Sequence, residues 1–315
     1  MPDPGPAPTL HGSTTARRAL ATASVLLRSL RPPFLLLTPV CIAIGWAAAR
    51  SAPSPSLAGL ILLAGLCAHA AVNVLNEYQD FISGLDQHTV RTPFSGGSGA
   101  LPAYPAAAPA VAALALCLIA ATVLLGMALV FRVGGWLLLP GLAGVVLILS
   151  YTRWLNRSAL LCLFAPGLGF GPVLVLGSEI AVTGSASLTG LFVSSLPLFL
   201  GSALLLLNQL PDLEADARVG RRHLAIRYGP AASAQVYAAL ILAAIVTLLL
   251  GVVIGALPPP SMMALVPFPL AWIAWRGAHR HCNHIGLEAP QALGANVVLS
   301  MSAPSLLALS LYLSH

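Results

Sequence analysis

Long apolar stretches, separated by short polar segments, run through almost the whole of this sequence and restrict the chain to a membrane. A helix of about 20 apolar residues crosses the hydrocarbon core of a bilayer. Only 8% of the 315 residues are charged, while 58% are hydrophobic; a soluble domain carries roughly 25% charged residues. So few charges cannot cover a water-exposed surface, which excludes a soluble enzyme of any class.

Nine of these stretches are candidates for membrane-spanning helices, and they predict an all-α integral membrane protein. The eighth is short and contains proline, so eight spans are the alternative count. Gly167, Gly169 and Gly171 in the fifth stretch predict close helix packing. The nine stretches cover residues 33–49, 56–81, 108–131, 136–151, 159–176, 188–210, 231–256, 262–275 and 292–313.

The placement of arginine predicts which side of the membrane each loop faces, because cytoplasmic loops collect positive charge. All fifteen basic residues are arginine. With the N-terminus inside, only Arg50 and Arg132 fall in outer loops. This bias predicts a multi-pass protein of the cell inner or plasma membrane with a cytoplasmic N-terminus. It also accounts for the net charge of +6 without a nucleic-acid partner, and no obligatory protein partner is indicated.

The chain divides into an N-terminal arm, residues 1–31, and a single transmembrane domain, residues 32–315. The first dozen residues are rich in proline and small side chains, a composition typical of disorder. Residues 14–30 then place arginines on one side and Leu and Val on the other. This pattern predicts an amphipathic helix lying in the membrane interface, in contact with lipid.

The nine carboxylates of the chain are unevenly distributed, and their positions predict a functional site. An acidic side chain near membrane depth costs several kcal/mol unless it is paired or bound to a metal. Clustering such side chains therefore calls for a functional explanation. Six of the nine fall into two short clusters: Glu77, Asp80 and Asp86 in the first, and Asp212, Glu214 and Asp216 in the second.

The first cluster lies at the inner end of the second span. Asn76 and Asp80 are four residues apart, so they share one face of a helix. Gly84 is suited to end that helix, which would let Asp86 fold back toward Asp80.

The second cluster lies at the inner end of the sixth span and repeats the pattern. Asn208, Asp212 and Asp216 step by four, which predicts a single stripe on one helix face. Glu214 points away from this stripe and is expected to be solvated. Both clusters therefore lie on the same side of the membrane, which indicates a weak internal repeat.

The oxygen-only donor set of the two clusters favours a hard cation, Mg²⁺ before Ca²⁺ or a transition metal. Mg²⁺ keeps several waters and is commonly shared with substrate phosphates. Two facing stripes are suited to hold two or three such ions around one diphosphate. The predicted metal ligands are Asn76, Asp80, Asp86, Asp212 and Asp216, with Asn208 as a further ligand or neighbour.

Arginines follow each cluster and are candidates for binding the diphosphate. Arg91 comes five residues after Asp86, and Arg218, Arg221 and Arg222 follow Asp216. Guanidinium groups bind phosphate oxygens bidentately. The alternative is that these arginines only report topology. Likewise, the Gly/Ser segment 95–99 either offers backbone N–H groups to a phosphate or is a flexible loop.

These motifs resemble those of the UbiA superfamily of intramembrane prenyltransferases, and the resemblance covers nearly the entire chain. The resemblance implies helices around a central cavity, with the two Asp-rich motifs on helices two and six. The five residues between Asp80 and Asp86 look most like the 1,4-dihydroxy-2-naphthoate, or menaquinone, branch. There are departures: Glu77 stands where Asp is common, with an arm that could still reach a metal, and His223 and Arg221 replace a small hydroxyl residue and a lysine.

The resemblance implies a reaction. Asp80, Asp86, Asp212 and Asp216 would be the catalytic residues, holding Mg²⁺ against a polyprenyl diphosphate, and an aromatic acceptor would attack the resulting allylic cation. Tyr151 is a candidate for contact with that cation, and an interfacial anchor is its alternative role.

Two other functions compete with this interpretation. A terpene cyclase of the same family would use the same motifs but trap the cation without an acceptor. A carrier of polyprenyl lipids would use the acids for binding alone. Transporters usually place charged groups near the midplane of the bilayer, whereas these acids lie at one membrane face, which favours an enzyme.

Overall fold

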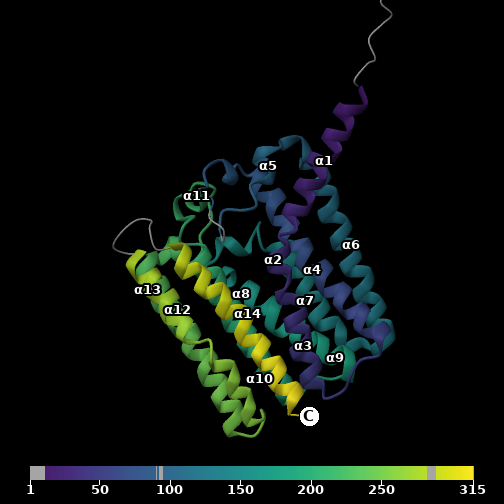
Figure 1. Ribbon diagram of the computed structural model, residues 1–315, viewed down its shortest axis with the longest axis vertical. Helices are drawn as coiled ribbons and strands as arrows, with labels where there is room; N and C mark the ends of the chain where they lie inside the picture. Colours follow the sequence, from purple (N-terminus) through teal and green to yellow (C-terminus); the bar gives the residue numbers. More distant parts are fainter. Residues whose placement is uncertain (1–10, 90, 92–94, 282–288, 315) are drawn as a thin grey trace, which may run out of the picture.

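The computed structural model of the chain describes residues 11–89, 91, 95–281 and 289–314, and these residues form helices and connecting loops with no strand. The long helices run side by side along one axis (Figure 1). The α-helices are α1 (His11–Ser29), α2 (Pro32–Leu35), α3 (Leu37–Ala49), α4 (Pro55–Ile82), α5 (Ala100–Ala103), α6 (Ala108–Val133), α7 (Leu138–Ser150), α8 (Ala159–Leu168), α9 (Gly177–Thr183), α10 (Leu188–Asn208), α11 (Leu213–Arg218), α12 (Leu224–Val253), α13 (Pro269–His281) and α14 (Ala289–Leu313).

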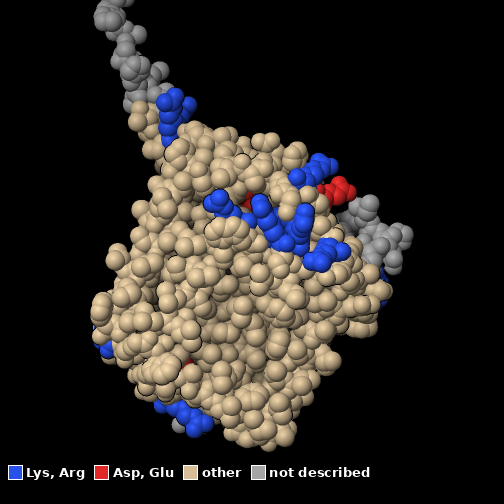
Figure 2. Space-filling view, turned by 180° about the vertical axis from the view of Figure 1, so that it is seen from behind, with Lys and Arg blue, Asp and Glu red and all other residues tan. Residues whose placement is uncertain are grey.

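Seven helical segments in the described part of the chain are long and apolar enough to cross a membrane, which confirms an all-α membrane protein. The predicted stretches 136–151 and 262–275 form shorter helices: α7 with the turn before it, and the pair η6 (Pro259–Leu265) and α13. The count of nine spans therefore stays a prediction. Figure 2 shows a wide belt free of charged side chains between the two ends of the molecule, as a lipid-facing surface requires.

Helix α10 forms the centre of the bundle. Of its most apolar 18-residue window 61% is buried, against 11% for the segment that contains α6, so α6 faces outward and α10 is enclosed. Small residues bring neighbouring helices close to α10: a Cβ atom on Gly167 or Gly171 would collide with a backbone carbonyl of α10. The predicted packing role is confirmed for these two glycines. Gly169 differs, because a Cβ there would meet no atom within 4 Å.

Local sequence fixes the ends of the helices that carry the two acidic clusters. Helix α4 begins after Ser54, whose hydroxyl accepts from the Leu57 N–H, with Pro55 in the first turn. It ends before Gly84, which adopts a left-handed φ of 77°, a conformation that glycine tolerates best. Helix α10 ends at Asn208, shortly before Pro211, which cannot continue a regular helix.

The N-terminal arm lies at the same end of the bundle as the short helices α5 and α11 (Figure 1). Helix α1 exposes Leu20 and Leu27, and it packs on α5 and α6. Residues 1–10, for which disorder is predicted, lie outside the described residues.

Candidate active site

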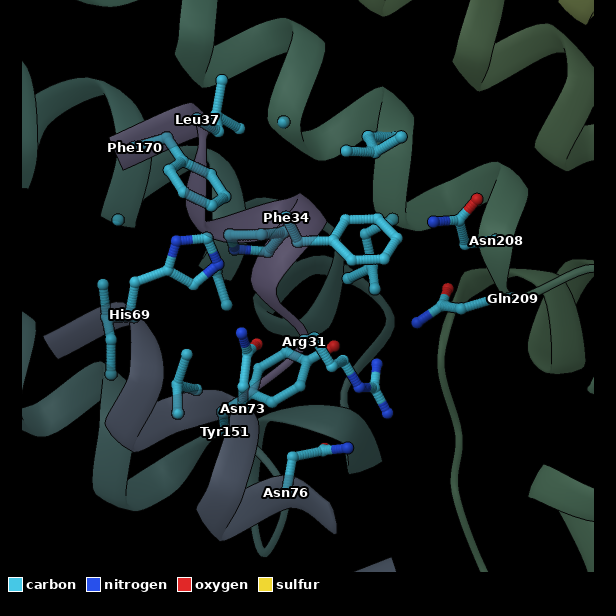
Figure 3. Close-up of a pocket in the computed structure, with 18 of the residues that line it drawn as sticks. Arg31, Phe34, Leu37, His69, Asn73, Asn76, Tyr151, Phe170, Asn208 and Gln209 are labelled. Atoms are coloured by element: carbon cyan, nitrogen blue, oxygen red, sulfur yellow. The ribbon is translucent and has the colours of Figure 1, made fainter. Parts of the chain in front are cut away.

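A cavity of about 450 Å³ extends into the bundle between α4, α10 and the π-helical segment η5 (Gly169–Leu176). Along α4 its lining runs from Gly65 to Asp80, roughly 22 Å at 1.5 Å per residue. Figure 3 shows Asn76, Tyr151 and Asn208 around this space. The cavity combines a polar end, where both acidic clusters lie, with walls that include Leu37, Phe170, Leu174 and Met301.

The first cluster meets the cavity as the sequence predicts. Asn76 donates to Asp80 Oδ2 at 2.8 Å, one turn further along α4. Thr152 in turn donates to Asn76 Oδ1 at 3.0 Å. Both members of the pair line the cavity, so the predicted shared face is confirmed and Thr152 fixes the orientation of the amide.

Asp86 returns to the cavity through the turn at Gly84. It lies in the short helix η1 (Leu85–Gln87), is 6% exposed and lines the cavity. Burial, reinforced by the nearby carboxylates of Glu77 and Asp80, raises the pKa of Asp86 to about 7.

The second cluster also lines the cavity, but not as one helical stripe. Asn208 ends α10, Asp212 precedes α11, and Asp216 lies within α11. The predicted single stripe is wrong, because the chain leaves the helix around Pro211 and starts a new one. Burial, together with the charge of Asp216, raises the pKa of Asp212 to about 7 although the Gly96 N–H donates to its carboxylate.

Arg221 joins the two clusters. Its Nη1 lies 2.8 Å from Asp216 Oδ1, and its Nη2 pairs with Asp80 of the first cluster. Burial alone would lower the pKa of Arg221, but the charges of Asp80 and Asp216 outweigh it and raise that pKa. A fixed cation therefore lies between the two acidic motifs, inside the cavity.

The predicted arginines lie elsewhere. Arg218 and Arg222 are exposed and do not line the cavity. Arg91 donates to the backbone carbonyl of Asp86 at 3.4 Å and is exposed as well. Among the described arginines, Arg31 and Arg221 line the cavity. Arg221 is one of the arginines that follow Asp216 but is not among the predicted site residues, and no pattern in the sequence indicates Arg31. Tyr151 lines the cavity as expected.

Glu77 accepts hydrogen bonds from the Gly/Ser segment 95–99 and does not line the cavity. Its carboxylate accepts from the Ser98 N–H at 3.1 Å, from the Ser98 hydroxyl, and from Arg31 at 3.3 Å. Because Glu77 contacts this segment and lies outside the cavity lining, its position differs from the expectation that Glu77 reaches a metal. Ser95, Gly96 and Gly97 consequently lie along the polar end of the cavity.

The donor atoms at the polar end fit a hard cation that retains water. Buried oxygens of Asp86, Asn208 and Asp212 have no hydrogen-bond partner among the described residues, and unpaired buried acceptors are costly. No three carboxylate, histidine or thiol groups of the described chain are close enough to enclose one ion alone. Oxygen donors that leave part of the coordination shell free suit Mg²⁺, which can complete its shell with water and phosphate oxygens.

Comparison with known proteins identifies the family. Residues 36–285 match the UbiA prenyltransferase family. The chain belongs to this family. It is therefore a transferase of prenyl groups that is embedded in the membrane.

Individual relatives extend the comparison. The chain is 28% identical to a 1,4-dihydroxy-2-naphthoate octaprenyltransferase of Bacillus subtilis (strain 168), over 66% of this chain and 67% of that one. It is 29% identical to the enzyme of the same name from Mycobacterium leprae (strain TN), over 69% and 72%. A UbiA homolog from Archaeoglobus fulgidus bound to DMAPP and Mg²⁺ shares the fold, with a TM-score of 0.64 at 14% identity over 90% and 98% of the two chains.

Proposed function

We propose that the protein transfers a prenyl group from a polyprenyl diphosphate to an aromatic acceptor, a quinone precursor such as 1,4-dihydroxy-2-naphthoate. The observation that carries this proposal is the meeting of two Asp motifs at the polar end of an otherwise largely apolar cavity. The diphosphate belongs at the polar end and the isoprenoid chain along the apolar walls. The names of the two bacterial relatives support the naphthoate acceptor.

Asp80, Asp86, Asp212 and Asp216 would hold Mg²⁺, with Asn76 and Asn208 beside them. Bound Mg²⁺ neutralises charge on the diphosphate and makes it a better leaving group. The Mg²⁺-bound UbiA homolog of A. fulgidus supports this choice of metal. Each Asp contributes negative charge at the polar end of the cavity, and the side-chain amides of Asn76 and Asn208 add neutral oxygen donors.

Arg221 adds a protein cation at the same place. When the C–O bond of the donor breaks, its electron pair leaves with the diphosphate, and a guanidinium fixed between the motifs stabilises that charge. The apolar walls exclude water from the allylic cation, and Tyr151 offers a ring face to it. The acceptor ring then forms the new C–C bond and regains aromaticity by losing carbon dioxide or a proton.

The position of the acids argues against a carrier. They lie near or beyond the ends of α4 and α10, whereas transporters usually place charged groups near the midplane of the bilayer. We also propose that this end faces the cytoplasm with the N-terminus, as the arginine distribution indicates.

The test is to incubate the purified protein with Mg²⁺ and farnesyl or geranylgeranyl diphosphate, with and without dihydroxynaphthoate. Diphosphate release that depends on the aromatic acid, with a prenylated ring as product, is the expected result. Release without the acid, yielding a hydrocarbon or terpene alcohol, would identify a cyclase instead. No release with any donor would support a carrier.

A further inference from the structure

His223 contacts Asp216 on the side away from the cavity. The residue precedes α12 in an extended conformation and is 1% exposed. Its Nε2 lies 2.9 Å from Asp216 Oδ2, while Arg221 binds Asp216 Oδ1 at 2.8 Å. Each oxygen of this carboxylate therefore has its own donor. Asp216 lines the cavity and His223 does not.

The hydrogen bond defines the tautomer of the imidazole. Because the carboxylate accepts, Nε2 carries the hydrogen and donates it. The other ring nitrogen, Nδ1, is buried and has no hydrogen-bond partner in the described part of the chain. The one side-chain hydrogen bond of His223 in the described part of the chain is therefore the one to Asp216.

The neighbouring backbone also favours a fixed Asp216. The Asp216 N–H donates to the Asp212 carbonyl at 2.9 Å, and the Asp216 carbonyl accepts from the Arg221 N–H at 3.1 Å. Backbone bonds thus hold the main chain on both sides of this residue. The remaining freedom is rotation of the carboxylate, which the contacts from His223 and Arg221 restrict from its two oxygens.

We propose that His223 is a positioning residue that orients the Asp216 carboxylate toward the cavity and thereby sets the metal affinity of the site. This inference rests on the proposed Mg²⁺-dependent function. Outer groups that hydrogen-bond a ligand typically change metal affinity by about 10-fold to 100-fold when they are removed. His223 is not itself a catalytic residue, because it reaches the cavity only through Asp216.

The experiment measures metal binding directly, with Mn²⁺ as a spectroscopic substitute for Mg²⁺ in the purified protein without substrate. The variants are His223→Ala, His223→Gln and His223→Asn. The Gln amide nitrogen reaches about as far from the backbone as Nε2, whereas the Asn amide nitrogen reaches only about as far as Nδ1. His279→Ala is the matched control, since His279 is exposed and stacks on Trp275 away from the cavity.

We expect Mn²⁺ affinity to fall about 10-fold to 100-fold in His223→Ala and His223→Asn, and to recover in His223→Gln. The Mg²⁺ concentration for half-maximal activity should rise in parallel, with a smaller change in kcat at saturating Mg²⁺. Wild-type affinity in His223→Ala, or equal affinities in the Gln and Asn variants, would overturn the positioning role. If the wild-type protein binds no Mn²⁺ even when inorganic pyrophosphate is present to supply phosphate oxygens, the proposed metal site itself is wrong.

Discussion

Arg221 lies 2.8 Å from Asp216, and its second guanidinium nitrogen pairs with Asp80, 141 residues earlier in the chain. One side chain therefore links the acidic motifs of the two halves. The carboxylates of Asp80 and Asp216 would repel each other strongly in a water-poor cavity. The positive charge of Arg221 between them offsets this repulsion.

Replacing Arg221 with Met should lower kcat by about 10²-fold to 10³-fold, the usual loss when a group stabilising transition-state charge is removed. Arg221→Lys should lose less, because it keeps the charge but not the two-pronged contact. Diphosphate release at saturating Mg²⁺ measures the effect. Arg227→Ala is the control, since Arg227 is exposed and outside the cavity lining. Equal activity of Arg221→Met and the control would show that Arg221 does not contribute to catalysis.

Asp80→Ala and Asp212→Ala should each reduce turnover to the background level, because each removes a predicted metal ligand from a different motif. Glu214→Ala provides the matched control within the second acidic cluster, as Glu214 is exposed and does not line the cavity. Product formation with each variant over a range of Mg²⁺ concentrations makes the comparison. Near-normal turnover in either Asp variant would contradict the metal assignment.

The first motif could be predicted because its geometry is local. Asn76 and Asp80 lie in an uninterrupted helix, where a spacing of four residues fixes a common face. Gly84 has the left-handed conformation expected of a residue that ends a helix, so Asp86 returns to the same cavity. None of these steps needs contacts from distant parts of the chain.

The second motif and the arginines required the tertiary structure. A spacing of four predicts one face only while the helix continues, and the chain leaves the helix between Asn208 and Asp212. In the turn after α11, no helical period indicates which arginine faces inward. Arg221 is enclosed by Asp80 and Asp216, whereas Arg218 and Arg222 are exposed. Only the fold distinguishes them.

Metal binding should strengthen as the pH rises from about 6 to about 8. Burial, followed by neighbouring carboxylates, raises the pKa of both Asp86 and Asp212 to about 7 in the metal-free protein. Below that pH both groups hold protons that Mg²⁺ must displace, and above it they are ionised. Mn²⁺ titrations at the two pH values measure the change. An affinity that is independent of pH, or weaker at the higher pH, would contradict the combination of raised pKa values and metal ligation for these two carboxyls.

Gly171→Ala should destabilise the bundle by about 1–3 kcal/mol through overpacking, because the added methyl group would collide with the Ser194 carbonyl oxygen of α10. A backbone atom in the central helix cannot move aside as a flexible side chain can. Gly126→Ala in α6 is the opposite case: its methyl group meets no atom within 4 Å. Alanine is also the better helix former, by about 1 kcal/mol. Thermal unfolding midpoints in one detergent should therefore fall for Gly171→Ala and stay level or rise for Gly126→Ala. A fall of equal size in both variants would mean that the close approach of η5 to α10 does not limit stability.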